Sequence, residues 1–290
     1  MKKKILASLL MSTVVLTIGG QMVSATELNA AKTTGDVGFT FGDKPETVKP
    51  EEGPKDEDDT VIEEDKDKDG KPKPLPNNGG IYVTHLPSIS FGNSNKTSLK
   101  TTDYPAYTEK RTLVDSPEGE SKDFYMPHSV QVSDLSGNEK STWKLSVSQD
   151  SAFKSEDGIS ELVNSRINIY ETTFTNSLRD KQTLADNING ISITESTKFN
   201  SIPVGSEEGQ LTVLESKKPG FTNASTTSAV FSKDYVASNF SPKLTGETAA
   251  YAGVKLNVPA SDNSKAKVYR TELTWTLTVE PGNTEGSGEE

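Results

Sequence analysis

Short stretches of alternating apolar and polar residues follow one another along the chain from about residue 79 onward. Such alternation is typical of β-strands, because successive side chains of a strand point to opposite faces. The clearest stretches are SISFG at 88–92, SVQVSD at 129–134, RINIY at 166–170, GISIT at 190–194, QLTVL at 210–214, SAVFS at 228–232 and GVKLNV at 253–258. Gly, Asn, Asp and Pro clusters separate them, as turns require. The pattern predicts an all-β domain at 79–285, an antiparallel sandwich or barrel-like fold.

Three further stretches complete the predicted elements. ISELVNS at 159–165 and DYVASNF at 234–240 are the two segments that the pattern allows as brief helices. In GDVGFTFG, the apolar residues of 37–41 alternate with Gly and Thr, which is the pattern of a half-buried strand. We expect this strand to pair with the sheet of the main domain; the alternative is a leader without structure.

A strongly acidic segment separates that strand from the main domain. Residues 43–74 read DKPETVKPEEGPKDEDDTVIEEDKDKDGKPKP, with thirteen acidic residues against seven lysines. Its few apolar residues cannot bury enough surface to offset the entropy lost on ordering. We therefore expect residues 43–78 to be an acidic, Pro-rich, disordered linker that follows a mature N-terminal segment at 26–42.

Two strings near this linker resemble known motifs but lack their essential parts. DKDKDG at 65–70 supplies the first half of a calcium loop, but position 12 is Pro76 where a bidentate glutamate is required. LPNNG at 75–79 is similar to a sortase sorting signal, yet more than two hundred residues follow it instead of a short apolar tail. We expect neither a metal site nor covalent wall anchoring from them.

The N-terminus has the features of a secretory signal peptide. Three lysines at 2–4 precede an apolar run from Ile5 to about Ile18, and VSA at 23–25 offers the small residues that signal peptidase requires. The run is shorter than the roughly 17–25 apolar residues of a membrane-spanning helix. We expect residues 1–25 to be removed and the mature protein to be secreted and extracellular; an uncleaved anchor is the alternative.

Composition excludes several kinds of chemistry. The chain has no cysteine, so it has no disulfide, thiol nucleophile or cysteine-bound metal. Removal of residues 1–25 takes away three lysines and no acid, which changes the net charge from −11 to −14. A chain this acidic is not expected to bind nucleic acid through charge. Its two histidines, His85 and His128, stand in no catalytic or zinc motif, so we expect no catalytic residue and no cofactor.

The two tryptophans of the chain lie in similar tripeptides, WKL at 143–145 and WTL at 275–277. On a strand, each tryptophan shares one face with the leucine two residues later. One interpretation is that both faces are buried in a sandwich core. The other is that the tryptophans lie partly exposed near one another as an aromatic platform for wall glycan. The candidate binding residues are Trp143, Leu145, Tyr269, Leu273, Trp275 and Leu277.

The second tripeptide stands in YRTELTWTLTVEP at 269–281, which reads Tyr-x-x-x-Leu-Thr-Trp-x-Leu with a following proline. With the first tripeptide, this resembles the signature of the WxL-domain family of Gram-positive surface proteins. GIYVTHLPSISFG at 79–92 is similar to the stretch ending in Phe-Gly that opens the family's core domain, and VQVSDLSG at 130–137 resembles the segment before its first Trp-x-Leu. The resemblance implies non-covalent attachment to cell-wall peptidoglycan.

The resemblance also implies protein partners. These are other WxL proteins and a membrane-anchored WxL-interacting protein, in complexes that face host or plant-derived ligands. We therefore expect a non-enzymatic surface protein. The first alternative is an adhesin or complex subunit retained by the membrane-anchored protein rather than by glycan. The second is a secreted polysaccharide-degrading enzyme, because the two carboxylates of a glycosidase meet in space and not in sequence.

Overall fold

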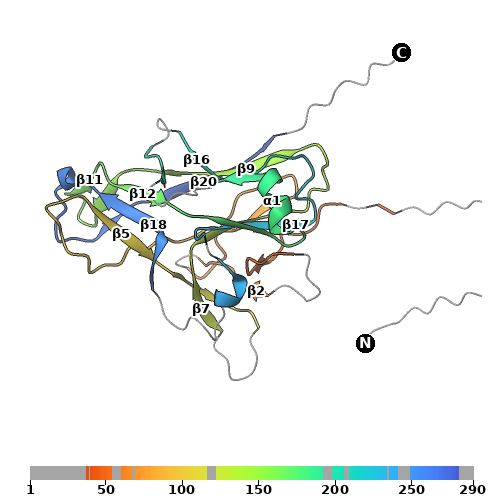
Figure 1. Cartoon of the computed structure of the whole chain (residues 1–290), viewed down its shortest axis with the longest axis horizontal. Coiled ribbons are helices and arrows are strands. Elements are labelled where there is room, and N and C mark those ends of the chain that lie inside the picture. Colours follow the sequence, from red (N-terminus) through yellow and green to blue (C-terminus); the bar gives the residue numbers. More distant parts are fainter. Residues whose placement is uncertain are drawn as a thin grey trace, which may run out of the picture. The chain divides into compact units, whose positions relative to one another are not determined.

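Antiparallel strands make up most of the computed structural model, which describes residues 37–38, 40–53, 60–66, 69–115, 122–191, 198–205, 209–233, 235–240 and 249–280. Residues from Thr40 onward form one compact unit, and of the preceding unit only Val37 and Gly38 are described. Three larger sheets form the centre of the main unit (Figure 1). The fold class therefore agrees with the alternating sequence pattern.

One of these sheets holds both Trp-x-Leu tripeptides. Its strands, in spatial order, are β14 (Ile188–Gly190), β16 (Leu211–Ser216), β9 (Thr142–Gln149) and β20 (Leu273–Glu280). All its neighbours pair antiparallel, with a bulge in β16 between Thr212 and Leu214. Because β20 is at the edge of the sheet, its outer side is less covered than that of β9.

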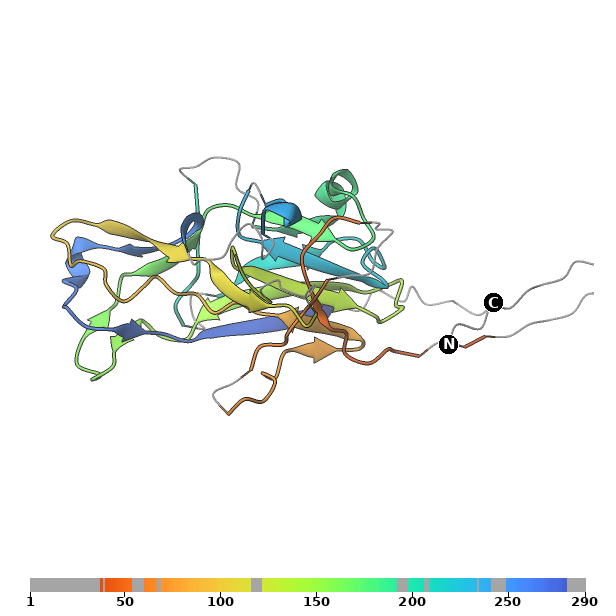
Figure 2. The ribbon, with the colours of Figure 1, turned by 90° about the horizontal axis from the view of Figure 1, so that it is seen from below.

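Two further sheets face the same core. One has the order β13 (Thr173–Asn176), β17 (Ser225–Val230), β8 (Ser129–Asp134), β4 (Ile81–His85) and β3 (Asn77–Asn78). The other has the order β15 (Asn200–Ser201), β12 (Arg166–Ile169), β18 (Ala250–Val258) and β5 (Thr102–Tyr107). Buried apolar side chains from all three sheets form one cluster. In Figure 2, β5 in yellow and β20 in blue lie in different layers around that core.

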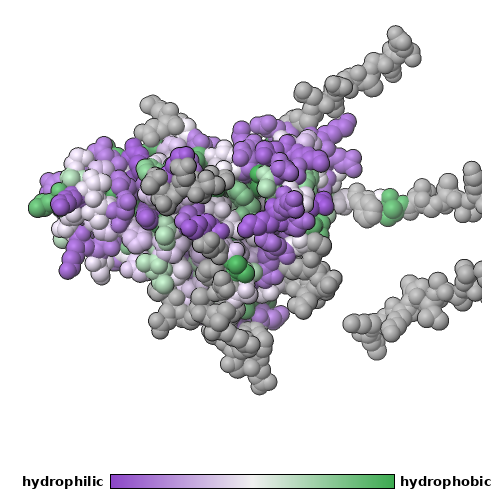
Figure 3. Space-filling model, in the orientation of Figure 1, coloured by the Kyte–Doolittle hydropathy of each residue, from purple (hydrophilic) through white to green (hydrophobic). Residues whose placement is uncertain are grey.

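Short elements complete the main unit. Three small sheets pair β1 (Thr47–Val48) with β2 (Val61–Ile62), β6 (Glu109–Thr112) with β7 (Asp123–Met126), and β10 (Phe153–Ser155) with β11 (Glu161–Leu162) and β19 (Tyr269–Arg270). The helical pieces are α1 (Lys181–Asn187), η2 (Ala237–Phe240) and η3 (Ala260–Asp262). Among the coloured residues of Figure 3, hydrophilic ones form several groups and strongly hydrophobic ones are scattered.

Most of the predicted strands are present, the one at 190–194 lies mainly outside the described residues, and two local predictions were wrong. The stretch at 159–165 is not a helix but holds β11 followed by a turn at 163–164; of its apolar residues only Leu162 is buried, while Ile159 and Val163 are exposed. The stretch at 88–92 was predicted as a strand but is a loop. The helix α1 was not predicted. Helix α1 buries only Leu184, so it lacks apolar periodicity. At 234–240 the predicted helix is a single 3₁₀ turn, η2.

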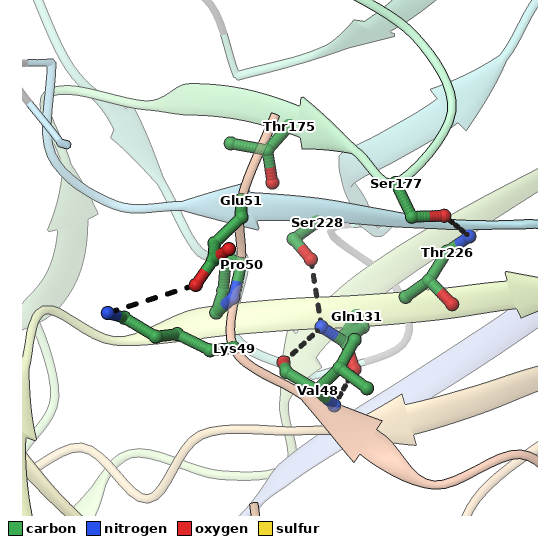
Figure 4. A pocket seen from close by; sticks show the side chains of 9 residues that line it. All are labelled: Val48, Lys49, Pro50, Glu51, Gln131, Thr175, Ser177, Thr226 and Ser228. Carbon is green, nitrogen blue, oxygen red and sulfur yellow. Dashed lines mark hydrogen bonds and ion pairs between the residues drawn. The ribbon is translucent and has the colours of Figure 1, made fainter. Parts of the chain in front are cut away.

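The acidic segment holds more structure than its composition predicts. Residues 47–53, which we name the strap, cross the outer side of β8 and β17 (Figure 4). The Gln131 side chain accepts a hydrogen bond from the Val48 N–H (3.0 Å) and donates one to the Val48 carbonyl (2.8 Å), as a paired strand would. Further along, the Gly53 N–H donates to the Asn176 carbonyl (2.9 Å). Polar contacts thus order a segment that has few apolar side chains.

The structure differs from the sequence prediction at these residues. Residues 43–78 were expected to be disordered throughout, yet β1, β2 and β3 lie within them, while 54–59 and 67–68 are outside the described residues. A strand was also expected at 37–41. The four described residues of this stretch are not in a strand, and Phe39 is outside the described residues. Just after this stretch, the Tyr82 hydroxyl donates to the Gly42 carbonyl (3.0 Å). This contact is made by a side chain of β4 and is not part of a backbone strand pairing.

Replacing Gln131 with leucine should release the strap. Gln131 is buried, and the substitution leaves the N–H and C=O of Val48 without partners, which costs about 1–3 kcal/mol. We expect amide exchange at Val48 and Gly53 to accelerate while exchange in β9 stays slow. Gln182→Leu on the exposed side of α1 is the matched control. Unchanged protection of Val48 in the Gln131 variant would contradict this account of the strap.

Candidate binding groove

The two Trp-x-Leu tripeptides lie on neighbouring antiparallel strands. In the register of β9 and β20, Leu145 is opposite Leu277, while Trp275 is opposite Val147. Trp143 is opposite Val279, four positions from Trp275, which corresponds to about 13 Å along a strand. The two motifs therefore share one sheet and one face, but the two tryptophans do not form a single platform.

Trp143 belongs to the core. Its side chain is 2% exposed, and Leu145 is fully buried beside it. The indole Nε1–H donates to Thr222 Oγ1 (2.9 Å), and the Thr222 hydroxyl donates to Asp134 Oδ2 (2.7 Å). This chain satisfies the only polar atom of the indole, as a buried tryptophan requires. The first tripeptide is thus part of the core, and its indole ring is closed to a ligand from outside.

Trp275 lines a groove of about 780 Å³. Residues from six segments form it: 73–75, the loop at 86–97, β5, the region of β10 to β12, β18, and the stretch from 264 into β20. Its apolar and aromatic lining residues are Leu75, Leu86, Ile89, Phe91, Tyr104, Phe153, Leu162, Ile167, Leu256, Val258, Val268, Tyr269, Leu273 and Trp275. The groove also has polar lining residues, so it presents apolar and polar surface in similar shares, and its volume is within the range of small-ligand sites.

The structure divides the six candidate residues into two groups. Tyr269, Leu273 and Trp275 line the groove and are partly exposed. The other three do not line it: Trp143 and Leu145 are buried, and Leu277 packs partly buried against the core. Only the N-terminal part of the second motif is therefore accessible at this site.

Sequence reasoning missed one wall of the groove. The stretch at 88–92 was predicted as a strand, but it is part of the loop that brings Ile89 and Phe91 to the groove. Gly92 has a φ of +80°, and a Cβ there would lie 2.7 Å from the Tyr107 ring. Glycine is therefore favoured at this position, both by the positive φ and by the nearby ring. The glycine that follows Phe91 was the sequence feature that could have indicated this turn.

Two tyrosines fix the loops on either side of the groove. The Tyr104 hydroxyl donates to the Lys96 carbonyl (2.8 Å), and the Tyr269 hydroxyl accepts from the Lys265 N–H (3.0 Å). Both rings line the groove, so each contributes an aromatic face to it and a polar atom to the backbone of a flanking loop. The two flanking loops are therefore held by side chains of the groove itself.

Both histidines are buried, and neither lines the groove. The His85 ring nitrogens face Asp65 Oδ2 (3.0 Å) and Glu109 Oε2 (3.2 Å), and Arg111 lies against the same ring. His128 contacts the Tyr251 hydroxyl (2.7 Å) and the Ser88 carbonyl (3.1 Å). Asp65, the first residue of DKDKDG, is thus engaged in an ion cluster with the protein itself.

This cluster predicts a loss of stability in acid. Burial alone would raise the pKa of Asp65, but the hydrogen bond with His85 and the charges of His85 and Arg111 lower it to about 2. The pKa of Glu109 is also lowered, because the effects of His85 and Arg111 outweigh burial. Burial lowers the pKa of His128. A depressed carboxylate pKa stabilises the fold above the ordinary values of 3.8 and 4.5, and this contribution is lost as pH falls towards 2.

Unfolding in denaturant at several pH values measures this effect. The free energy of unfolding should fall below about pH 6.5, where unfolded His128 takes up protons more readily than the folded residue, and fall further below 4.5. Asp65→Asn should cost roughly 1–2 kcal/mol at pH 7, allowing for solvent screening, and only a small part of that near pH 2. Asp186→Asn on α1 is the control. A deficit for Asp65→Asn that is constant with pH would show that its charge is not the cause.

Comparison with known protein families gives one match. A family model described as "WxL domain surface cell wall-binding" matches residues 26–281. No curated protein and no solved structure matches the chain. Within the described residues, no helix is both long and apolar enough to cross a membrane.

Proposed function

This chain belongs to the WxL family of cell-wall-binding surface domains, and from that premise we propose that it binds peptidoglycan non-covalently through the groove lined by Trp275. The observation that carries the proposal is the contrast between the two tryptophans. Trp143 is enclosed by the core, whereas Trp275 is partly exposed in the groove. Aromatic rings in such a position offer contact area at a low entropic cost to the sugars and peptides of the wall.

We place the protein outside the cell. The family match begins at residue 26, directly after the expected cleavage site at Ala25, which supports a signal peptide at 1–25. Export is also required by the proposed function, because a domain that binds the cell wall can contact it only outside the membrane. We also propose that the chain is not an enzyme: both histidines are held in buried structural contacts, and none of the described residues that line the groove is a carboxylate.

Membership of a larger surface complex is part of this proposal. By resemblance to its family, the chain would join other WxL proteins and a membrane-anchored WxL-interacting protein, in complexes that face host or plant-derived ligands. The competing function is that this protein partner, and not the wall polymer, retains the chain at the surface. The groove favours the polymer because its size suits a short oligomer.

Sedimentation with purified, protein-free peptidoglycan tests the proposed function. The mature chain should sediment with it, and denaturant should release the chain without muralytic enzyme. Buffer without peptidoglycan, and peptidoglycan with an unrelated acidic β protein, are the controls. If the chain stays in solution but sediments with walls that retain membrane-anchored proteins, the protein partner is the retaining element. Release of reducing ends or muropeptides during incubation would indicate an enzyme instead.

A further inference from the structure

The groove has the opposite charge to the rest of the chain. The protein carries 42 acidic and 31 basic residues. Of the described residues that line the groove, however, five are basic and none is acidic: Lys73, Lys96, Lys265, Lys267 and Arg270. In an acidic protein, this sign reversal at a concave site indicates an anionic ligand.

Two of these cations are already paired at the outer rim. Lys267 Nζ lies 2.8 Å from Asp157 Oδ2, and Arg270 Nη2 lies 2.8 Å from Glu156 Oε1. Lys96 and Lys265 are exposed and make no ion pair with a described residue. The net positive charge of the site therefore comes mainly from these two lysines, together with Lys73, whose ammonium is 3.4 Å from Ser88 Oγ.

The two exposed lysines are positioned by the floor of the groove. Tyr104 holds the backbone of Lys96, and Tyr269 holds the backbone of Lys265. The cations consequently flank an apolar surface to which Ile89, Leu256 and Trp275 contribute. A ligand that fits this arrangement has small apolar groups along its length and carboxylates that reach the lysines.

We propose that the groove binds the carboxylate-bearing stem peptides of peptidoglycan rather than its sugar chain alone. This inference rests on the proposed function and specifies which part of the wall is recognised. Neutral sugars would gain little from the ammonium groups of Lys96 and Lys265, whereas short peptides rich in alanine offer methyl groups to the apolar floor and carboxylates to these two lysines. Ammonium–carboxylate contacts at an exposed rim are weak individually, so salt should reduce the affinity.

Calorimetry with three soluble probes tests the inference on the full mature chain. The probes are a synthetic stem tetrapeptide, the same peptide with all its carboxylates amidated, and peptide-free glycan chains from amidase-treated peptidoglycan. The acidic peptide should bind, and amidation should weaken it about fivefold, as expected for losing two exposed ion pairs. Lys96→Gln combined with Lys265→Gln should weaken the acidic peptide by the same factor but leave the amidated peptide unchanged. Lys100→Gln, on the same loop outside the groove, should change neither.

The outcomes separate the inference from the proposed function. Binding to intact peptidoglycan and to peptide-free glycan, with no effect of the lysine substitutions, would overturn the inference and leave wall binding intact. Peptide binding without sedimentation on peptidoglycan would support the ligand class and contradict the proposed function. A soluble glycerol-phosphate polymer that displaces the peptide at lower concentration than the peptide's own Kd would assign the lysines to wall phosphates and overturn the inference. If neither the peptide nor peptidoglycan binds, both proposals fail.

Discussion

Trp143→Ala is expected to destabilise the domain by about 3–5 kcal/mol, the range for emptying a buried aromatic site. Trp143 is 2% exposed within the cluster that all three larger sheets share, and little can relax into the space that the indole leaves. The substitution also removes the donor to Thr222, which connects β9 to Asp134 at the end of β8. Since domains of this size have a total stability of about 5–15 kcal/mol, much of the margin is lost.

Denaturant unfolding measures this loss, with Trp143→Phe as the matched variant. Phenylalanine keeps most of the buried volume and removes only the Nε1–H donor, so its cost should be nearer 1–2 kcal/mol. Wall binding by Trp143→Ala should fall in proportion to the unfolded fraction and return when the folded state is favoured at lower temperature. If Trp143→Ala is as stable as the unaltered chain, the placement of this residue in the core is incorrect.

Trp275→Ala is expected to weaken peptidoglycan binding about thirtyfold, which corresponds to a tryptophan hot spot of roughly 2 kcal/mol. Because the ring is partly exposed at the edge strand β20, its removal should cost clearly less stability than that of Trp143. Sedimentation at a series of peptidoglycan concentrations gives the affinity, and thermal unfolding gives the stability. Both measurements are needed, because only a folded variant reports on binding.

Val279→Ala is the matched control for Trp275→Ala. Val279 lies on the same strand and face, four residues further on, but outside the groove. Its removal should leave the affinity unchanged. Equal losses of affinity in both variants would mean that the whole face of β20, and not the groove, contacts the wall.

Alternation along the sequence predicted the face of each tryptophan but not its exposure. A period of two assigns Trp143 and Trp275 to one side of their strands, and the structure agrees. Whether a strand is central or at an edge depends on pairings between distant segments. Because β9 lies between β16 and β20, its tryptophan is enclosed, whereas β20 has one neighbour in its sheet and begins at the groove. The exposure of Trp275 therefore follows from the position of β20 in the sheet, and the residues next to Trp275 in the sequence do not predict that position.

Two other misses have the same physical origin. The strap was predicted as disordered because composition measures apolar burial, whereas Gln131 holds Val48 through hydrogen bonds over a sequence distance of 83 residues. The stretch at 88–92 alternates like a strand, yet its backbone turns at Gly92 and its apolar side chains line the groove instead of pairing. Hydrogen bonds to a distant side chain order the strap, and the positive φ of Gly92 turns the backbone at 88–92.

Acrylamide quenching of tryptophan fluorescence tests most directly whether the wall ligand occupies the groove. The chain has only two tryptophans, so the buried Trp143 should be shielded and the partly exposed Trp275 quenched without any substitution. Saturating soluble peptidoglycan fragments should remove the quenchable component and leave the shielded one unchanged. A quenchable component that persists unchanged while the fragments are bound would contradict binding at Trp275.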